Sequence, residues 1–292
     1  MSSFIDLHTH SNASDGVETP SRVFELAVAV GLSAVALTDH DTVFGVEEFL
    51  AAGKKSVGTE AIAGIELSSL YASAREIHIV GLFIDPTAPG LLDFIALQRE
   101  SRRRRNEAIR IKLTALGFPL TWDEPEFSLG IDGVGRPHFA RALIRKYGFP
   151  DIRSVFDKLL GHSRPAFVPR RLPDAGAAIA AIHAAGGVAV WAHPTYRERN
   201  ERAFLRRAAR HLSGRGLDAM EGYYSLFGPG ETALVTEIAT AAGLAISGGS
   251  DFHGGDPGFQ VGTGAGGLRV PAELLPELRR RHQLISARTS PV

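Results

Sequence analysis

Short apolar segments alternate with helical patterns along most of this 292-residue chain. Seven segments rich in valine, isoleucine and alanine have the length and composition of buried strands. They are FIDLHTH, SAVALTDHD, AIAGIELSS, EIHIVGLF, GVAVWAHP, LDAMEGYYS and LAISGGSDFH. Strands that alternate with helices in this way predict a parallel sheet covered by helices. We therefore expect an α/β protein whose strands form a distorted (β/α)7 barrel.

The region between residues 91 and 172 does not follow this alternation. It begins with a long charged helical pattern that contains four consecutive arginines at 102–105, and shorter helical patterns follow at residues 136–148 and 151–161. We interpret it as an inserted helical subdomain that recognises the substrate. On this interpretation residues 1–90 and 173–292 form the barrel, and residues 91–172 form the insertion.

Composition excludes several classes of function. Lys+Arg and Asp+Glu are both 32, so the net charge is zero, which argues against a strongly basic nucleic-acid scaffold but permits a local basic patch. The absence of cysteine excludes a disulfide framework, a thiolate zinc site and a cysteine nucleophile. With no apolar run near about 18 residues and no signal-peptide pattern, we expect a cytoplasmic protein that does not bind membranes.

Histidine and carboxylate side chains lie at or near the ends of six of the predicted strands. Because such ends converge on one face of a barrel, and because residues i and i+2 share a strand face, these side chains can bind metal together. A single histidine at a strand end is more often structural, but a set on six strands indicates a metal site. His183, His211 and His282 lie away from the strand ends, and we interpret them as structural. The predicted site residues are His8, His10, Asp39, His40, Glu66, His78, His193, Asp251 and His253.

The motifs HTHSNASDG, LTDHD, GIE, the histidine of EIHIVG, AHP and SDFH resemble the ordered motifs of the PHP (polymerase and histidinol phosphatase) family. The resemblance covers residues 1–85 and 185–255 and implies a distorted seven-stranded barrel that binds two or three divalent metal ions. It implies three ligand sets: His8, His10, Glu66 and Asp251 for one metal; Glu66, His78 and His193 for a second; Asp15, His40 and His253 for a third.

Two metal ions about 3.5–4 Å apart activate a bridging water and polarise phosphoryl oxygens, so that in-line attack by hydroxide needs no protein nucleophile. We therefore expect a phosphoesterase in which Glu66, His193 and Asp251 hold the catalytic positions. Mixed histidine and carboxylate ligands suit Mn²⁺, Fe²⁺ or Zn²⁺. The proportion of carboxylates among the ligands and the absence of thiolate favour Mn²⁺.

The insertion contains GVGRPHFARAL and is similar to that of the PHP subgroup acting on nucleoside 3′,5′-bisphosphates and on the 5′ ends of short RNA. This resemblance implies a phosphatase that removes the 3′-phosphate from small nucleotides such as pAp. Four alternatives remain open: a 5′–3′ exonuclease on short RNA oligonucleotides, a histidinol-phosphate-type phosphatase, a metal-bound accessory barrel without activity, and a C–N hydrolase. No obligate protein partner is indicated.

Four residues are candidates for substrate contacts. Arg136 precedes Pro137, a favoured first helical residue, so its guanidinium and the helix N-terminus can together bind a phosphate. His138 lies in the same motif. Arg104 belongs to the arginine run, and Arg197 follows the AHP strand near the expected active face.

Overall fold

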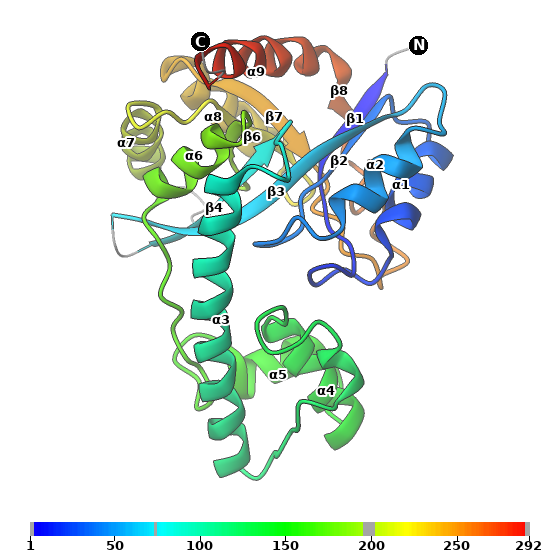
Figure 1. Ribbon diagram of the computed structural model, residues 1–292, viewed down its shortest axis with the longest axis vertical. Helices are drawn as coiled ribbons and strands as arrows, with labels where there is room; N and C mark the ends of the chain where they lie inside the picture. Colours follow the sequence, from blue (N-terminus) through cyan, green and yellow to red (C-terminus); the bar gives the residue numbers. More distant parts are fainter. Residues whose placement is uncertain (1–2, 73–74, 195–201, 290–292) are drawn as a thin grey trace. The chain divides into compact units, whose positions relative to one another are not determined.

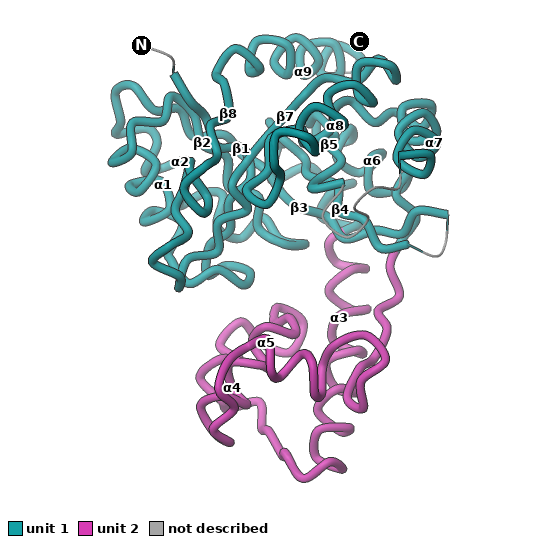
Figure 2. Tube along the Cα trace, turned by 180° about the vertical axis from the view of Figure 1, so that it is seen from behind, with its two compact units in different colours: residues 1–94, 173–292 teal, residues 95–172 magenta. Residues whose placement is uncertain are grey.

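The computed structural model describes residues 3–72, 75–194 and 202–289 (Figure 1). The chain divides into two compact units (Figure 2). The first contains residues 1–94 and 173–292, and the second contains residues 95–172. The boundary at residue 95 falls inside helix α3 (Pro89–Ala115), a few residues after the expected start of the insertion at residue 91. Each unit has a hydrophobic core of its own.

One mixed sheet of eight strands forms the centre of the described part of the first unit. Its spatial order is β7 (Ala245–Gly249), β6 (Ala219–Tyr224), β5 (Val188–Trp191), β4 (Arg75–Leu82), β3 (Glu60–Tyr71), β2 (Ala34–Leu37), β1 (Phe4–Thr9) and β8 (Val270–Pro271). The predicted α/β barrel is confirmed, and every predicted strand segment contains a strand.

The sheet is mixed, whereas the sequence predicted a parallel one. Strand β4 pairs antiparallel with both β3 and β5, and the short β8 pairs antiparallel with β1. Only three residues separate β3 from β4 in the sequence, which is too few for the crossover that two parallel strands require. The remaining neighbouring strands pair in parallel, so their C-terminal ends lie at one end of the barrel.

Strand β1 nearly closes the sheet into a barrel. Its start pairs with β8, where Ile5 faces Val270. At its other end, the His8 carbonyl accepts a hydrogen bond of 2.8 Å from the Asp251 backbone N–H. The His10 N–H in turn donates to the Phe252 carbonyl, also at 2.8 Å. This closure places the end of β1 beside the residues that follow β7.

Helices surround the sheet of the first unit (Figure 1). Leu278 and Ile285 of the last helix pack in one core cluster with Ile5, Leu82 and Val188, which lie away from the C-terminal ends of the parallel strands. The end of the barrel opposite the C-terminal ends of the parallel strands is therefore apolar and closed. The helices are α1 (Pro20–Ala29), α2 (Val46–Gly53), α6 (Ala175–Ala184), α7 (Arg202–Ser213), α8 (Pro229–Ala241) and α9 (Leu275–Thr289), with a 3-10 turn at Ala272–Leu274.

The second unit is helical. It contains most of α3, a 3-10 turn (Pro125–Phe127), α4 (Arg136–Tyr147), α5 (Ile152–Val155) and a π-helical turn (Phe156–Leu160). Its core is lined by apolar side chains that include Ile109, Leu113, Phe127, Phe139, Leu143 and Leu160. None of the helices in the described residues of either unit has both the length and the apolar composition needed to cross a membrane.

Candidate metal centre

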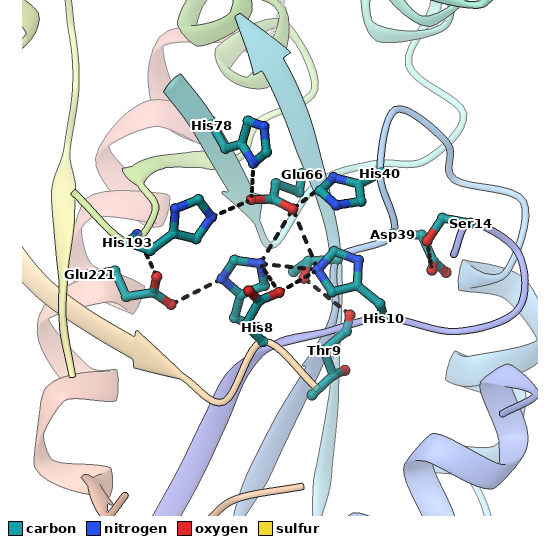
Figure 3. Close-up of polar contacts among 12 residues, drawn as sticks. His8, Thr9, His10, Ser14, Asp39, His40, Glu66, His78, His193 and Glu221 are labelled. Carbon is teal, nitrogen blue, oxygen red and sulfur yellow. Dashed lines mark hydrogen bonds and ion pairs between the residues drawn. The ribbon is translucent and has the colours of Figure 1, made fainter. Parts of the chain in front are cut away.

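His8 of β1 and His10, the residue that follows β1, direct their rings to a single point (Figure 3). The Nε2 atoms of His8 and His10 lie 3.1 Å apart. Each Nε2 also lies 3.4 Å from Glu66 Oε2. All three side chains are at most 1% exposed. The alternation of side chains along the strand therefore brings two imidazoles and one carboxylate together in the interior of the protein.

Glu66 is the centre of the cluster. Its Oε1 lies 2.9 Å from His78 Nδ1 and 3.1 Å from His193 Nε2, and its Oε2 lies 2.8 Å from His40 Nδ1. Glu66 is fully buried, and its Oε2 has no hydrogen-bond partner among the described residues. A buried carboxylate oxygen without such a partner is unfavourable unless a cation neutralises it.

Asp251 adds a second carboxylate beside His8 and His10. Its Oδ1 lies 3.1 Å from His10 Nε2 and 3.5 Å from His8 Nε2. Its Oδ2 accepts a hydrogen bond of 2.9 Å from the Tyr224 hydroxyl. The carboxylate is thus oriented by a neighbouring side chain and directed at the point where the two imidazoles meet.

A third group lies on the other side of His10. Asp15 Oδ1 is 3.2 Å from His253 Nε2 and 4.0 Å from His40 Nε2. The rings of His10 and His253 stack with their centroids 4.2 Å apart. The structure therefore brings together all nine side chains that the family resemblance implied as ligands.

These residues fit divalent metal ions. Among the described residues, ligand atoms lie within 4.8 Å of one another in four overlapping groups. Imidazole nitrogens and carboxylate oxygens without thiolate are ligands for Mn²⁺, Fe²⁺ or Zn²⁺. The groups are His8, His10 and Glu66; His8, His193 and Asp251; His40, Glu66 and His78; and His10, Asp15, His40 and His253.

Proton affinities differ among the clustered histidines. Burial, together with the nearby His253 and His40, lowers the pKa of His10 to about 3. Burial also lowers the pKa of His78, but the charge of Glu66 and its hydrogen bond outweigh burial and raise that pKa to about 10. His10 is therefore already neutral at pH 7, whereas His78 carries a proton in the absence of metal.

Burial and nearby negative charge also have opposite effects on a histidine pKa in the third group. Burial lowers the pKa of His253, but the charges of Asp15 and Asp251 outweigh it and raise the pKa to about 10. Because a histidine binds metal through a neutral nitrogen, metal binding at these positions must release protons.

Two ligand residues have strained backbones. His193 and Asp251 have φ angles of 34° and 58°, which lie in the left-handed region that residues other than glycine rarely adopt. Each follows the end of a strand, β5 or β7. Such conformations persist only where surrounding contacts hold them, and they concentrate at functional sites.

Comparisons with known proteins agree with this geometry. The family model described as PHP domain matches residues 6–118. A 5′-3′ exoribonuclease from Haemophilus influenzae is 36% identical over 253 residues, which cover 87% of this chain and 91% of that protein. A 3′,5′-nucleoside bisphosphate phosphatase from Chromobacterium violaceum is 36% identical over 270 residues, which cover 88% of this chain and 90% of that protein. The chain belongs to the PHP family. The predicted resemblance is thereby confirmed.

A solved structure supports the same assignment. A protein from Bifidobacterium adolescentis, described as a candidate metal-dependent phosphoesterase, superposes with a TM-score of 0.83 and 29% sequence identity, covering 96% of both chains. Together with the ligand cluster, these relatives identify the chain as a metal-dependent phosphoesterase of the PHP family, a hydrolase that acts on phosphoric esters.

One buried acidic residue of this PHP centre, Glu221, was not predicted from the sequence. Glu221, in the middle of β6, has its Oε1 3.0 Å from His8 Nδ1, and its Oε2 accepts a hydrogen bond of 2.6 Å from the His193 backbone N–H. In the sequence, Glu221 could have been recognised as an acidic residue inside an otherwise apolar strand segment, AMEGYY. A charged residue at such a position needs a partner, so it points to a polar interior.

Asp39 was named as a strand-end residue but lies outside the four ligand groups. It accepts hydrogen bonds of 2.7 and 2.6 Å from the backbone N–H and hydroxyl of Ser11, and one of 2.6 Å from the Ser14 hydroxyl. Burial raises its pKa to about 6. Asp39 therefore stabilises the loop that follows β1 and carries Asp15.

The three histidines interpreted as structural have partners outside the ligand groups. His183 Nε2 lies 2.8 Å from Asp218 Oδ2. His211 Nδ1 lies 3.4 Å from the Tyr71 hydroxyl. His282 Nδ1 lies 2.8 Å from the Gly186 carbonyl.

Three of the candidate substrate residues belong to the second unit. Arg136 is the first residue of α4, and its guanidinium lies 5.6 and 5.8 Å from the ring centroids of Phe156 and Phe167. His138 is buried, and its Nδ1 accepts a hydrogen bond of 3.0 Å from the Gly135 N–H, so this nitrogen caps the helix. Arg104 is exposed and bonds Glu100 at 2.7 Å. Arg197 lies outside the described residues.

Proposed function

We propose that this PHP phosphoesterase removes the 3′-phosphate from nucleoside 3′,5′-bisphosphates such as pAp, giving a nucleoside 5′-monophosphate and phosphate, with Mn²⁺ as its metal. The observation that carries the proposal is the position of Glu66 between two groups of ligands. One of its oxygens faces His8 and His10, and the other faces His78 and His193. The activity of the Chromobacterium relative supplies the substrate class.

The ligands open onto a cavity of about 150 Å³. His40, Glu66, His78, His193 and Asp251 all line it. None of the described residues that line the cavity is a serine, threonine or cysteine. In the chemistry proposed here, an activated water takes the place of a nucleophile from the protein. The substrate would approach the centre from this side.

The protein's own groups have separate proposed tasks. When bound, two divalent ions would activate water and neutralise charge on the phosphoryl oxygens. Glu66 would hold both ions, while His8, His10 and Asp251 would complete one position and His78 and His193 the other. Tyr224 would keep the Asp251 carboxylate in place through its hydrogen bond. Asp15, His40 and His253 would hold a third ion.

In this proposal the second phosphate of the substrate binds outside the metal centre. Arg136 is the proposed anchor, because its guanidinium brings a fixed positive charge to the first turn of α4, where the helix dipole favours an anion. His138, Arg104 and Arg197 remain further candidates for substrate contacts. The helical unit of residues 95–172 would thus supply selectivity, while the barrel supplies the phosphoryl chemistry.

A phosphate-release assay tests the proposal. The Mn²⁺-loaded protein should release phosphate from pAp faster than from 5′-AMP, 3′-AMP, histidinol phosphate or an aryl phosphate. Equal rates on all of these substrates would contradict selectivity for bisphosphates. Faster release from histidinol phosphate would favour that class of phosphatase. Inactivity of a fully loaded protein on every phosphoester would favour an accessory barrel, and amide substrates would then test a C–N hydrolase.

A 5′–3′ exonuclease on short RNA is the second candidate. The Haemophilus relative is named for that activity, and its match covers 87% of this chain, compared with 88% for the Chromobacterium phosphatase. The two reactions give different products. An exonuclease would release nucleoside 5′-monophosphates from a 5′-phosphorylated oligonucleotide of two to five residues, whereas the phosphatase would release inorganic phosphate from pAp. Chromatography of both reactions with one preparation would compare their kcat/KM values.

A further inference from the structure

Glu221 contacts two residues, His8 and His193, that the proposed ligation assigns to different metal positions (Figure 3). Its Oε1 lies 3.0 Å from the ring nitrogen Nδ1 of His8, and its Oε2 lies 2.6 Å from the backbone nitrogen of His193. The side chain is 3% exposed. The rings of His8 and His193 stack beside it with their centroids 5.7 Å apart. One buried carboxylate therefore connects the end of β1 with the residue just after β5.

The contact with His8 determines which ring nitrogen can bind metal. When the Nδ1–H of His8 donates to Glu221, the lone pair of Nε2 is directed toward the cluster. That Nε2 lies 3.4 Å from Glu66 Oε2 and 3.5 Å from Asp251 Oδ1. A carboxylate behind an imidazole ligand fixes its tautomer and orientation and raises its basicity.

The contact with His193 acts on the backbone. His193 has a φ angle of 34°, a conformation that needs support from its surroundings. The hydrogen bond from its N–H to Glu221 provides such support. The resulting turn directs the ring of His193 toward the metal centre, where its Nε2 lies 3.1 Å from Glu66 Oε1.

We infer that Glu221 is a positioning residue that couples the two metal positions. Glu66 would join the positions by direct contact, and Glu221 would join them through hydrogen bonds to one ligand of each. The inference rests on the proposed metal ligation but not on the substrate, so it can fail or succeed independently of the bisphosphate assignment. Loss of Glu221 is expected to weaken metal binding at both positions, although Glu221 itself binds no metal.

The test compares Glu221→Gln with a matched control, Asp218→Asn. Asp218 also contacts a ring nitrogen and a backbone N–H, because its Oδ2 lies 2.8 Å from His183 Nε2 and 2.8 Å from the Ala189 N–H. However, His183 belongs to none of the ligand groups of the described residues. The glutamine can accept only one of the two hydrogen bonds that Glu221 accepts. Mn²⁺ affinity is measured on the full chain by competition with a chelating dye, and metal-free thermal stability is measured in parallel.

We expect Glu221→Gln to lower Mn²⁺ affinity about 10- to 100-fold, the usual effect of removing a partner of a ligand. Phosphatase activity should recover as Mn²⁺ is raised. Asp218→Asn should bind Mn²⁺ like the unchanged protein, even if its melting temperature falls. Unchanged affinity in Glu221→Gln, or an equal loss in Asp218→Asn, would overturn the inference.

Glu221→Asp provides a second test that does not depend on the folding of the glutamine variant. It keeps the charge but is one methylene shorter, so it cannot maintain both contacts. We expect a loss of Mn²⁺ affinity smaller than that in Glu221→Gln but still several-fold. Folded Glu221→Asp with unchanged affinity would also overturn the coupling role.

Discussion

In the proposed metal centre, Glu66 is the residue on which metal binding would most depend, because one of its oxygens faces His8 and His10 and the other faces His78 and His193. We predict that Glu66→Ala loses bound metal and at least about 1000-fold in turnover, because removing a ligand shared by two ions removes the charge stabilisation that both supply. Circular dichroism should still show a folded barrel. Elemental analysis of the purified variant tests this prediction. Full metal content would show that Glu66 is not a ligand shared by two ions.

Arg136 carries the proposed selectivity. We predict that Arg136→Ala lowers kcat/KM for a 3′,5′-bisphosphate by about 10- to 1000-fold, equivalent to about 1.5–4 kcal/mol for a lost charge-assisted contact. Turnover of an aryl phosphate, which has no second phosphate, should change little. Arg103→Ala is a suitable control, because Arg103 is not a candidate for substrate contact, is exposed and pairs with Glu100 at 2.8 Å. An equal loss on both substrates would assign Arg136 to the reacting phosphate, and no loss on either would make it a structural residue.

At the scale of single residues, spacing determined what the sequence could predict. His8 and His10 were predictable because their separation of two residues places both rings on one strand face. Glu221 was not, since it is an isolated acidic residue whose partners, His8 and His193, lie far from it in the sequence. Asp39 shares a motif with His40, and only the structure distinguishes the carboxylate that stabilises a loop from the imidazole beside Glu66.

The three residues of the third proposed ligand group follow three different strands. Asp15 comes from the loop after β1, His40 follows β2, and His253 follows β7. Because Asp15 lies within 4.0 Å of both histidines, the three alanine substitutions should lower activity by similar factors. Parallel measurements of kcat/KM and of metal stoichiometry would check this prediction. If one variant were fully active and another inactive, the three residues would not share an ion.

The elements themselves were largely predictable from the sequence, whereas their directions were not. Each apolar strand segment was recognisable by composition, and so was the change in pattern at the insertion. Strand–helix alternation indicated a parallel sheet, but β3 and β4 form a hairpin that reverses the chain. The closing contacts between β1 and Phe252 were also not predictable, because they join residues more than 240 positions apart and depend on the whole barrel.

For the whole molecule, the pKa values of the centre predict that metal binding depends on pH. The pKa values of His78 and His253 are raised to about 10 in the metal-free protein, so these histidines carry protons at pH 7, which an incoming ion must displace. Mn²⁺ affinity should therefore rise as pH increases from 6 to 9, with protons released into a weakly buffered solution. Affinity that is constant over this range, without proton release, would contradict these protonation states.

The clustered histidines and carboxylates are proposed to form the metal centre at which this phosphoesterase hydrolyses phosphoric esters. The most direct test of this proposal is phosphate release from pAp by the full chain, first stripped with a chelator and then titrated with Mn²⁺. The predicted result is no measurable release by the stripped protein and activity that rises to saturation at two to three equivalents of Mn²⁺. Activity that survives complete removal of metal, or a fully loaded protein that releases no phosphate from any phosphoester, would contradict the proposal.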